Sequence, residues 1–178
     1  MAFHFRAATV ADIPAIRELI AASVRTLQIE YTVEQRELTL ATVFTVDTQL
    51  IADGTYLLAF AADGTFAGCG GWSKRKTLYG GDHQVEAIEP EFLNPAMDAA
   101  KIRAIFIHPA FSRQGLGSTI LERSENAAKD AGFRRFEMGS TLSGVPLYNL
   151  KGYRKQEEIR VPVGAGEGIA VVRMVKEI

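Results

Sequence analysis

The segment that decides the fold is Ile105-Phe106-Ile107-His108-Pro109-Ala110-Phe111-Ser112-Arg113-Gln114-Gly115-Leu116-Gly117-Ser118, a buried strand followed by a tight polar turn and a helix start. Because Gly115 and Gly117 have no side chains, the backbone can approach a ligand closely there. The first amides of the helix have no partner within it, and the helix dipole adds positive potential. The segment therefore predicts a phosphate or pyrophosphate site, supplemented by Arg113 and the Ser118 hydroxyl.

Other phosphate-binding motifs do not match this turn. The G-x-x-x-x-G-K-[ST] pattern is absent, and a dinucleotide fingerprint would require glycine or alanine at position 120, which is isoleucine. A glycine turn that merely redirects the chain is the alternative interpretation. The strand, Pro109, the basic residue and the helix together favour the anion site.

Hydrophobic periodicity on both sides of the turn predicts a single α/β domain over residues 1–178. Segment 74–99 lacks such a pattern and contains a Gly-Gly pair and two separate prolines. It is therefore expected to be a long functional loop. Glycines at 68, 70 and 71 indicate a bulge or a close approach in one strand. Strands are expected at 3–7, 56–61, 65–73, 102–108, 133–138, 154–161 and 168–175, and helices at about 13–27, 32–44, 117–131 and 146–150.

Composition excludes several classes of protein. The chain has 178 residues, 47% hydrophobic and 23% charged, which is incompatible with a disordered or fibrous chain. A formal net charge of -1 argues against a general nucleic-acid or anionic-membrane binder. The single Cys69 cannot form an intrachain disulfide, and the three histidines show no metal-ligand spacing, so no metal site is expected. Without a signal peptide or a transmembrane stretch, the expected location is the cytoplasm.

The turn resembles the acetyl-CoA loop of the GCN5-related N-acetyltransferase (GNAT) family. That signature is an apolar-x-Pro step followed by [QR]-x-x-G-x-[GA] at the start of a helix. Ile107-His108-Pro109 and Gln114-Gly115-Leu116-Gly117 fit it, whereas Ser112 replaces the first Gln or Arg. The resemblance extends from Phe3 to the last strand. It implies a mixed, mostly antiparallel central sheet with helices on both faces.

The resemblance also implies where acetyl-CoA binds. In the family, the strand before the loop separates from the next strand, and the pantetheine arm inserts between them. The main chain of Ile105, Phe106 and Ile107 is therefore expected to meet that arm. Thr141 stands where the family often has an asparagine that helps to hold the cofactor. The pyrophosphate is expected on Arg113, Gln114, Gly115, Leu116, Gly117 and Ser118.

Leu147-Tyr148-Asn149-Leu150-Lys151-Gly152-Tyr153 is similar to a second family signature. Acetyl transfer expels a thiolate that must be protonated, and a phenol within reach can donate that proton. Tyr148 is therefore the expected general acid, with an ordinary core tyrosine as the alternative. Tyr153 is expected to be structural.

The attacking amine must lose a proton, so a carboxylate or histidine is wanted near the thioester. Several family members carry a base on the strand that Glu137 occupies here, and Glu137 is the expected base. The alternative is a solvated glutamate paired with the arginine at 134 or 135. Asp82 and Glu86, in the expected long loop, are weaker candidates.

Little in the sequence identifies the acceptor. Lys74-Arg75-Lys76 would attract a carboxylate or phosphate, or else it is a solvated strand end. Five aromatic residues would either line an acceptor pocket or belong to the core: Trp72, Phe44, Tyr31, Tyr79 and Phe92. For Trp72 and Phe44 the core is favoured. Cys69 is expected to be a packed thiol.

These observations predict an acetyl-CoA-dependent N-acetyltransferase in which a primary amine, on a small molecule or a peptide, attacks the thioester directly. A non-catalytic acyl-CoA-binding sensor of the same fold is the alternative, and a phosphate-binding module unrelated to CoA is a third reading. Neither nucleic acid nor membrane is expected as a partner. Exposed sheet edges would also allow a homodimer.

Overall fold

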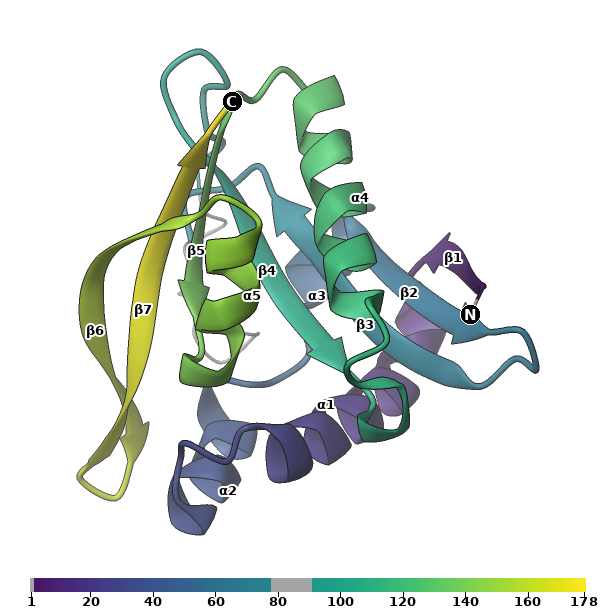
Figure 1. The fold of residues 1–178 in the computed structure, drawn as a ribbon, viewed down its shortest axis with the longest axis vertical. Coiled ribbons are helices and arrows are strands. Elements are labelled where there is room, and N and C mark those ends of the chain that lie inside the picture. Colours follow the sequence, from purple (N-terminus) through teal and green to yellow (C-terminus); the bar gives the residue numbers. More distant parts are fainter. Residues whose placement is uncertain (1, 78–90) are drawn as a thin grey trace.

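A computed structural model describes residues 2–77 and 91–178, so the candidates Tyr79, Asp82 and Glu86 lie outside the described residues. The described residues form one seven-stranded sheet in the order β1-β2-β3-β4-β5-β7-β6 (Figure 1). Its strands are β1 (Phe3–Ala7), β2 (Tyr56–Ala61), β3 (Phe66–Ser73), β4 (Ala100–Ile107), β5 (Arg135–Ser140), β6 (Arg154–Gly164) and β7 (Glu167–Glu177).

The sheet is mixed because one neighbouring pair, β4 and β5, runs parallel, whereas the other pairs are antiparallel. Helices cover both faces. The α-helices are α1 (Ile13–Leu27), α2 (Val33–Thr42), α3 (Thr48–Ala52), α4 (Leu116–Asp130) and α5 (Val145–Leu150). This architecture confirms the expected fold class.

The helices begin and end where local signals place them. Thr9 and Asp12 form a capping box on the short 3-10 turn before α1, and Pro14 occupies the first turn of that helix. Gly132 follows α4 with a φ of 97°, a left-handed conformation that favours glycine. Gly152 has a φ of 88° just after α5 and ends that helix in the same way.

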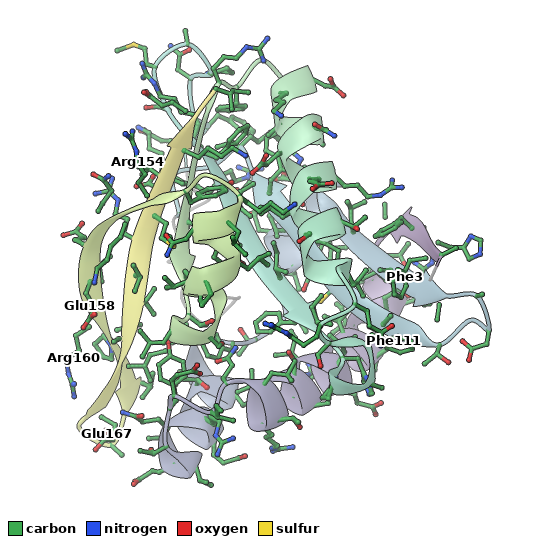
Figure 2. The ribbon with its side chains drawn as sticks, in the orientation of Figure 1. Phe3, Phe111, Arg154, Glu158, Arg160 and Glu167 are labelled. Atoms are coloured by element: carbon green, nitrogen blue, oxygen red, sulfur yellow. The ribbon has the colours of Figure 1, made fainter. Side chains whose placement is uncertain are left out.

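Two hydrophobic layers lie on opposite faces of the sheet. One contains Ile16 and Ile20 of α1 with Leu58 and Phe106 of the sheet. The other contains Leu121 of α4 and further side chains of β4, β5 and β7, and α4 and α5 cover this near face in Figure 1. At one end of the sheet the rings of Phe3 and Phe111 meet edge to face, 6.0 Å between centroids (Figure 2).

The spacing of apolar residues in the sequence predicts Val33, Ala41, Ala127 and Ala131 on buried helix faces, and these four predictions were wrong. Val33, expected to face inward, is 67% exposed because it begins α2 beside its Thr32 cap. Ala41, Ala127 and Ala131 are exposed as well. In α2 the fully buried residue is instead Thr39, whose hydroxyl donates to the Arg36 carbonyl and is thus satisfied.

The edge strands of the described sheet are β1 and β6. Edge strand β6 carries Arg154, Glu158 and Arg160 (Figure 2), charges that discourage uncontrolled pairing with another sheet. A homodimer through such edges stays a prediction. No helix in the described part of the chain is long and apolar enough to cross a membrane.

A buried ion pair ties α3 to β4. Asp47 accepts a hydrogen bond from the Leu50 amide at the start of α3, and its carboxylate lies 2.6 Å from the Arg103 guanidinium. Both side chains are almost fully buried, with 1% and 3% exposure for Asp47 and Arg103. Neither this pair nor the short helix α3 was predicted from the sequence.

Removing one member of that pair leaves the other charge buried without its counter-ion. We expect Asp47→Ala to lower the free energy of unfolding by about 3–5 kcal/mol, measured by urea denaturation. Glu37→Ala is the control, because it breaks the exposed Arg25–Glu37 pair and is expected to leave stability little changed. Equal losses in the two variants would contradict a special role for the buried pair.

Candidate functional site

A cleft opens where β4 and β5 separate. The two strands pair only through Ala100–Phe136 and Lys101–Glu137, and beyond these two pairs no ladder joins them. A narrow cavity of about 80 Å³ lies at the separation. One wall is the strand β4 and the other is the end of β5 with α5 and β7, and residues just after α1 and α2 close the cleft. The lining residues are Ile102, Arg103, Ala104, Ile105, Phe106, Met138, Gly139, Ser140, Thr141, Tyr148, Val171, Gln28, Val43, Phe44 and Thr45.

A bulge in β4 contributes to the separation. The register with β3 shifts between Cys69 and Gly71, so that Ala104 and Ile105 lie opposite the single residue Gly70. Ala104 has a φ of 56°, which is uncommon for a residue with a side chain. A Cβ on Gly70 would lie 2.7 Å from the Ile105 side chain, which confirms that β3 needs glycine for close approach.

The free edge of β4 presents main-chain groups to the cleft. The His108 amide donates to the Ala67 carbonyl across the β3 side. Because antiparallel pairing alternates, Phe106 also bonds toward β3, while the Ile105 carbonyl and both main-chain groups of Ile107 point to the opposite edge of β4, which faces β5 and has no ladder there. Of the three residues expected to meet a ligand through their main chain, two are therefore oriented to do so. Phe106 instead packs its ring on Phe44, 5.9 Å between centroids.

The turn before α4 has the features of an anion site. The amides of residues 113–118 have no acceptor among the described residues. Arg113 and Gly115 have φ values of 60° and 83°, and such left-handed residues curve successive amides into a concave nest. The Gln114 side chain donates to the Ala110 carbonyl at 3.0 Å and braces the turn.

The two glycines of the turn have different roles. A Cβ on Gly115 would meet nothing within 4 Å, so this residue is needed for its backbone conformation. A Cβ on Gly117 would lie 3.3 Å from Leu147 of α5, so its absence lets α4 approach α5. The expectation that the missing side chain of Gly117 lets a ligand approach stays a prediction.

Tyr148 reaches the cleft from α5 and is half-buried. Burial raises the pKa of its phenol to about 12, so the hydroxyl keeps its proton at neutral pH and is available as a donor. Its ring packs edge to face on Tyr153 at 5.9 Å. Tyr153 itself is buried and donates to the Glu125 carboxylate at 2.9 Å, a structural contact.

Thr141 lies at the end of β5 and lines the cleft. Its hydroxyl is 3.3 Å from that of Ser143, and the Ser140 hydroxyl donates to the Thr141 carbonyl at 2.7 Å. These contacts hold the turn between β5 and α5, the element that carries Tyr148.

Glu137 is placed differently from the expected base. Its carboxylate is buried and forms ion pairs with Lys101 of β4 and Arg173 of β7, not with the arginines at 134 and 135. Burial opposes its ionisation, but the hydrogen bonds and charges of Lys101 and Arg173 outweigh burial and lower the pKa of Glu137. It does not line the cleft, and a lowered pKa makes it a weak base.

The expected acceptor residues do not come together. Arg75, expected in a solvated strand end, is buried and pairs with Asp53 at 2.8 Å. Phe92 is 61% exposed and lies under the cations of Lys74 and Arg75. Trp72 is core, as predicted, and packs on Phe133. Among the named aromatic residues that the structure describes, Phe44 lines the cleft.

Two further residues from that prediction have structural contacts. Tyr31 donates from its hydroxyl to the Ala170 carbonyl at 2.6 Å, which ties the α1–α2 turn to β7. Cys69 is fully buried, as predicted for a packed thiol, and burial raises the pKa of its thiol to about 12. The described residues contain no cluster of acidic, histidine or cysteine side chains that would hold a metal ion.

Three polar residues of the cleft were not predicted from the sequence: Gln28, Thr45 and Arg103. A signal was present for Gln28, because it continues the stripe of Ile20 and Val24 at a spacing of four and so puts a polar group on the buried face of α1. Arg103 is likewise a charge within an apolar strand. Thr45 follows α2 and carries no comparable signal.

The chain is similar to one protein family and to several solved structures. The model of a family described as the acetyltransferase (GNAT) domain matches residues 41–178. A search among curated proteins by sequence finds no match.

Among solved structures, a GCN5-related N-acetyltransferase from Rhodopseudomonas palustris is 17% identical, with a TM-score of 0.74 and coverage of 100% of this chain and 97% of that one. The PaiA N-acetyltransferase from Thermoplasma acidophilum, solved with coenzyme A, is 15% identical, with a TM-score of 0.67 and full coverage of both chains. The yncA protein from Salmonella typhimurium, solved with acetyl-CoA, is 18% identical, with a TM-score of 0.62 and coverage of 99% and 94%. At these identities the likeness shows the fold.

The ion pairs of Glu137 make stability depend on pH. The lowered pKa means that their stabilisation is fully present above the ordinary pKa of 4.5 and is lost as pH falls through the folded-state value. We expect Glu137→Gln to be less stable than the parent at pH 7 in urea denaturation, and the difference to shrink near pH 3. A difference that is the same at both pH values would contradict this role.

Proposed function

The chain belongs to the acetyltransferase (GNAT) family, and we propose that it transfers an acetyl group from acetyl-CoA to a primary amine. The observation that carries the proposal is the cleft between β4 and β5, which has free main-chain groups on one wall and Tyr148 on another. The unpaired amides of residues 113–118 follow directly at the end of β4. A long ligand with an anionic end and a thin arm matches this combination.

In this proposal the amides of the turn before α4 bind the pyrophosphate, and the exposed Arg113 adds a positive charge. The free edge of β4 at Ile105 and Ile107 pairs with the amide groups of the pantetheine arm as a neighbouring strand would. We further propose that Thr141, which lines the cleft, holds the arm from the β5 side. The narrow cavity, about 80 Å³, suits an unbranched arm better than a bulky group.

The proposed chemistry is direct attack by the amine nitrogen on the thioester carbonyl. Main-chain amides on the free edge of β4 stabilise the negative charge that develops on the carbonyl oxygen. As the carbon–sulfur bond breaks, Tyr148 donates its phenolic proton to the departing thiolate. A phenol with a pKa of about 12 is neutral at physiological pH and therefore carries the proton to be donated.

For Glu137 we propose a positioning role in place of the expected role as base. Its partner Lys101 belongs to the last residue pair before β4 and β5 separate. The second partner, Arg173, anchors the same carboxylate to β7. Glu137 thus clamps the closed end of the cleft, and its loss would change the width of the cleft as well as the stability of the protein.

A non-catalytic acyl-CoA sensor is a second candidate, and one observation favours it. Among the described residues, no carboxylate or histidine lines the cleft, so none is placed there to deprotonate an amine. The two candidates differ in their products. An acetyltransferase releases free CoA when an amine is supplied, whereas a sensor binds CoA and releases none.

Replacing Tyr148 by phenylalanine tests the proposed general acid. We expect Tyr148→Phe to lower kcat by about 10²-fold or more, in the range observed for general acids, in an assay of thiol release from acetyl-CoA. The affinity for CoA in calorimetry is expected to stay nearly unchanged, because the phenol hydroxyl is not part of the proposed anion site. Unchanged turnover would remove Tyr148 from the mechanism.

The anion site is tested by two matched glycine substitutions. Gly115 and Gly64 have φ values of 83° and 85°, and a Cβ on either meets nothing within 4 Å. Both Gly115→Ala and Gly64→Ala are therefore expected to cost about 1–2 kcal/mol of stability through backbone strain alone. Only Gly115→Ala is expected to weaken CoA binding, by at least about tenfold in calorimetry, because relaxation of the strained backbone would move the amides of the nest. Equal CoA affinities in the two variants would place the pyrophosphate elsewhere.

A further inference from the structure

Two buried oxygen atoms beside the cleft have no partner among the described residues. They are Oε1 of Gln28, at the end of α1, and Oγ1 of Thr45, just after α2. Gln28 is only 6% exposed, and both residues line the cleft. A buried acceptor without a hydrogen bond costs free energy, so a native structure that keeps two of them at one cleft indicates a ligand that donates hydrogen bonds there.

A second cavity adjoins the cleft on the side of these oxygens. We call it the α1 groove; its volume is about 370 Å³, and it is lined by Ile13, Arg17, Ile20, Ala21, Arg25, Leu40, Phe44, Thr45 and Val46. Phe44 and Thr45 line the cleft as well, so the two cavities share a wall. Bound small molecules typically occupy cavities of about 300–1,000 Å³, a range that includes the groove but not the narrow cleft.

The lining of the groove combines apolar side chains with positively charged ones. Its lining includes two arginines and no acidic residue. Arg25 is neutralised by Glu37 of α2, which accepts from it at 2.7 and 2.8 Å. Arg17, on the same face of α1, is exposed and has no carboxylate partner among the described residues. The uncompensated charge of the groove is therefore the guanidinium of Arg17.

We propose that the acceptor is a small primary amine that carries a carboxylate or phosphate at the far end of an apolar body. The amine donates to Gln28 Oε1 and Thr45 Oγ1, the body lies in the α1 groove, and the anion pairs with Arg17. The inference rests on the proposed acetyl transfer. In that reaction the nitrogen–carbon bond forms as the carbon–sulfur bond breaks, and the thiolate takes its proton from Tyr148. The ammonium loses one proton to solvent to become the nucleophile. It loses a second on forming the amide, and that proton returns through solvent to the Tyr148 phenolate, so the net reaction releases one proton.

The anion preference is tested with pairs of acceptors that have the same chain length, an ω-amino carboxylate and the corresponding n-alkylamine. Thiol release from acetyl-CoA gives kcat/KM for each. We expect the protein to prefer the carboxylate by about tenfold or more, the size of one charge-assisted hydrogen bond. Arg17→Gln is expected to abolish the preference through KM, with kcat little changed.

Arg154→Gln is the matched control, because Arg154 is an exposed arginine on edge strand β6, away from α1 (Figure 2). It is expected to keep the preference of the parent protein. Equal rates for the two acceptors of a pair, or for a peptide amine without acidic groups, would overturn the inference. A preference that Arg154→Gln also removes would overturn the role of Arg17.

The proposed role of Gln28 Oε1 and Thr45 Oγ1 is tested by Gln28→Met and Thr45→Val. Each substitution keeps the approximate shape of the side chain and removes the hydrogen-bond acceptor. Each is expected to raise KM for both acceptors of a pair. Melting temperature is expected to be unchanged or higher, because an unpaired buried oxygen has been removed. An unaltered KM, or a clear loss of stability, would show that these oxygens serve the fold and not the acceptor.

Failure of the inference and failure of the proposed function are distinguishable. Thiol release with both acceptors at equal rates refutes the anion preference and leaves acetyl transfer standing. Absence of thiol release with every amine, despite CoA binding, refutes acetyl transfer. In that case calorimetric titration of the CoA-loaded protein with the ω-amino carboxylate still tests the groove, because binding is expected for the parent and for Arg154→Gln but not for Arg17→Gln.

Discussion

The rest of the structure depends on the early separation of β4 from β5. A parallel pair that continued past Lys101–Glu137 would satisfy the main-chain groups of Ile105 and Ile107 and fill the space between the strands. The bulge at Ala104 directs β4 away, and the glycines of β3 let it pass closely enough to keep its other edge paired. Because the ion pairs of Glu137 hold β4 and β5 together at one end, the cleft is closed at that end and widens toward the other.

The proposed anion site does not require a positively charged chain, and the formal net charge is -1. The positive potential comes from aligned amides at the turn before α4, which counting of charged side chains does not register. Several arginines elsewhere are paired with carboxylates, as Arg75 is with Asp53 and Arg173 is with Glu137. Local backbone geometry and a single exposed guanidinium can therefore set ligand preference without changing the overall charge.

The features that sequence predicted well are those encoded within a few residues. The glycine turn, the helix end at Gly132 and the short helix with Tyr148 each follow from local backbone requirements. The partners of Glu137 lie 36 residues away in both directions, on β4 and β7, and no local pattern encodes them. The same holds for Gln28 and Thr45, which follow different helices and come together only at the cleft. Val33 was misplaced because periodicity cannot tell which end of an amphipathic helix extends beyond the core.

The pKa values of Tyr148 and Glu137 are shifted in opposite directions, and both shifts keep the charge of the group fixed near neutral pH. Burial raises the pKa of Tyr148 to about 12, whereas Lys101 and Arg173 lower that of Glu137 below its ordinary 4.5. At a pH between these two pKa values the phenol stays neutral and the carboxylate stays ionised. The charges of both groups are therefore constant across the physiological pH range. A rate that varied with pH in that range would therefore report mainly the acceptor amine. The oxygens of Gln28 and Thr45 can accept hydrogen bonds from that amine without titrating themselves, so they orient the nucleophile while its proton leaves to solvent.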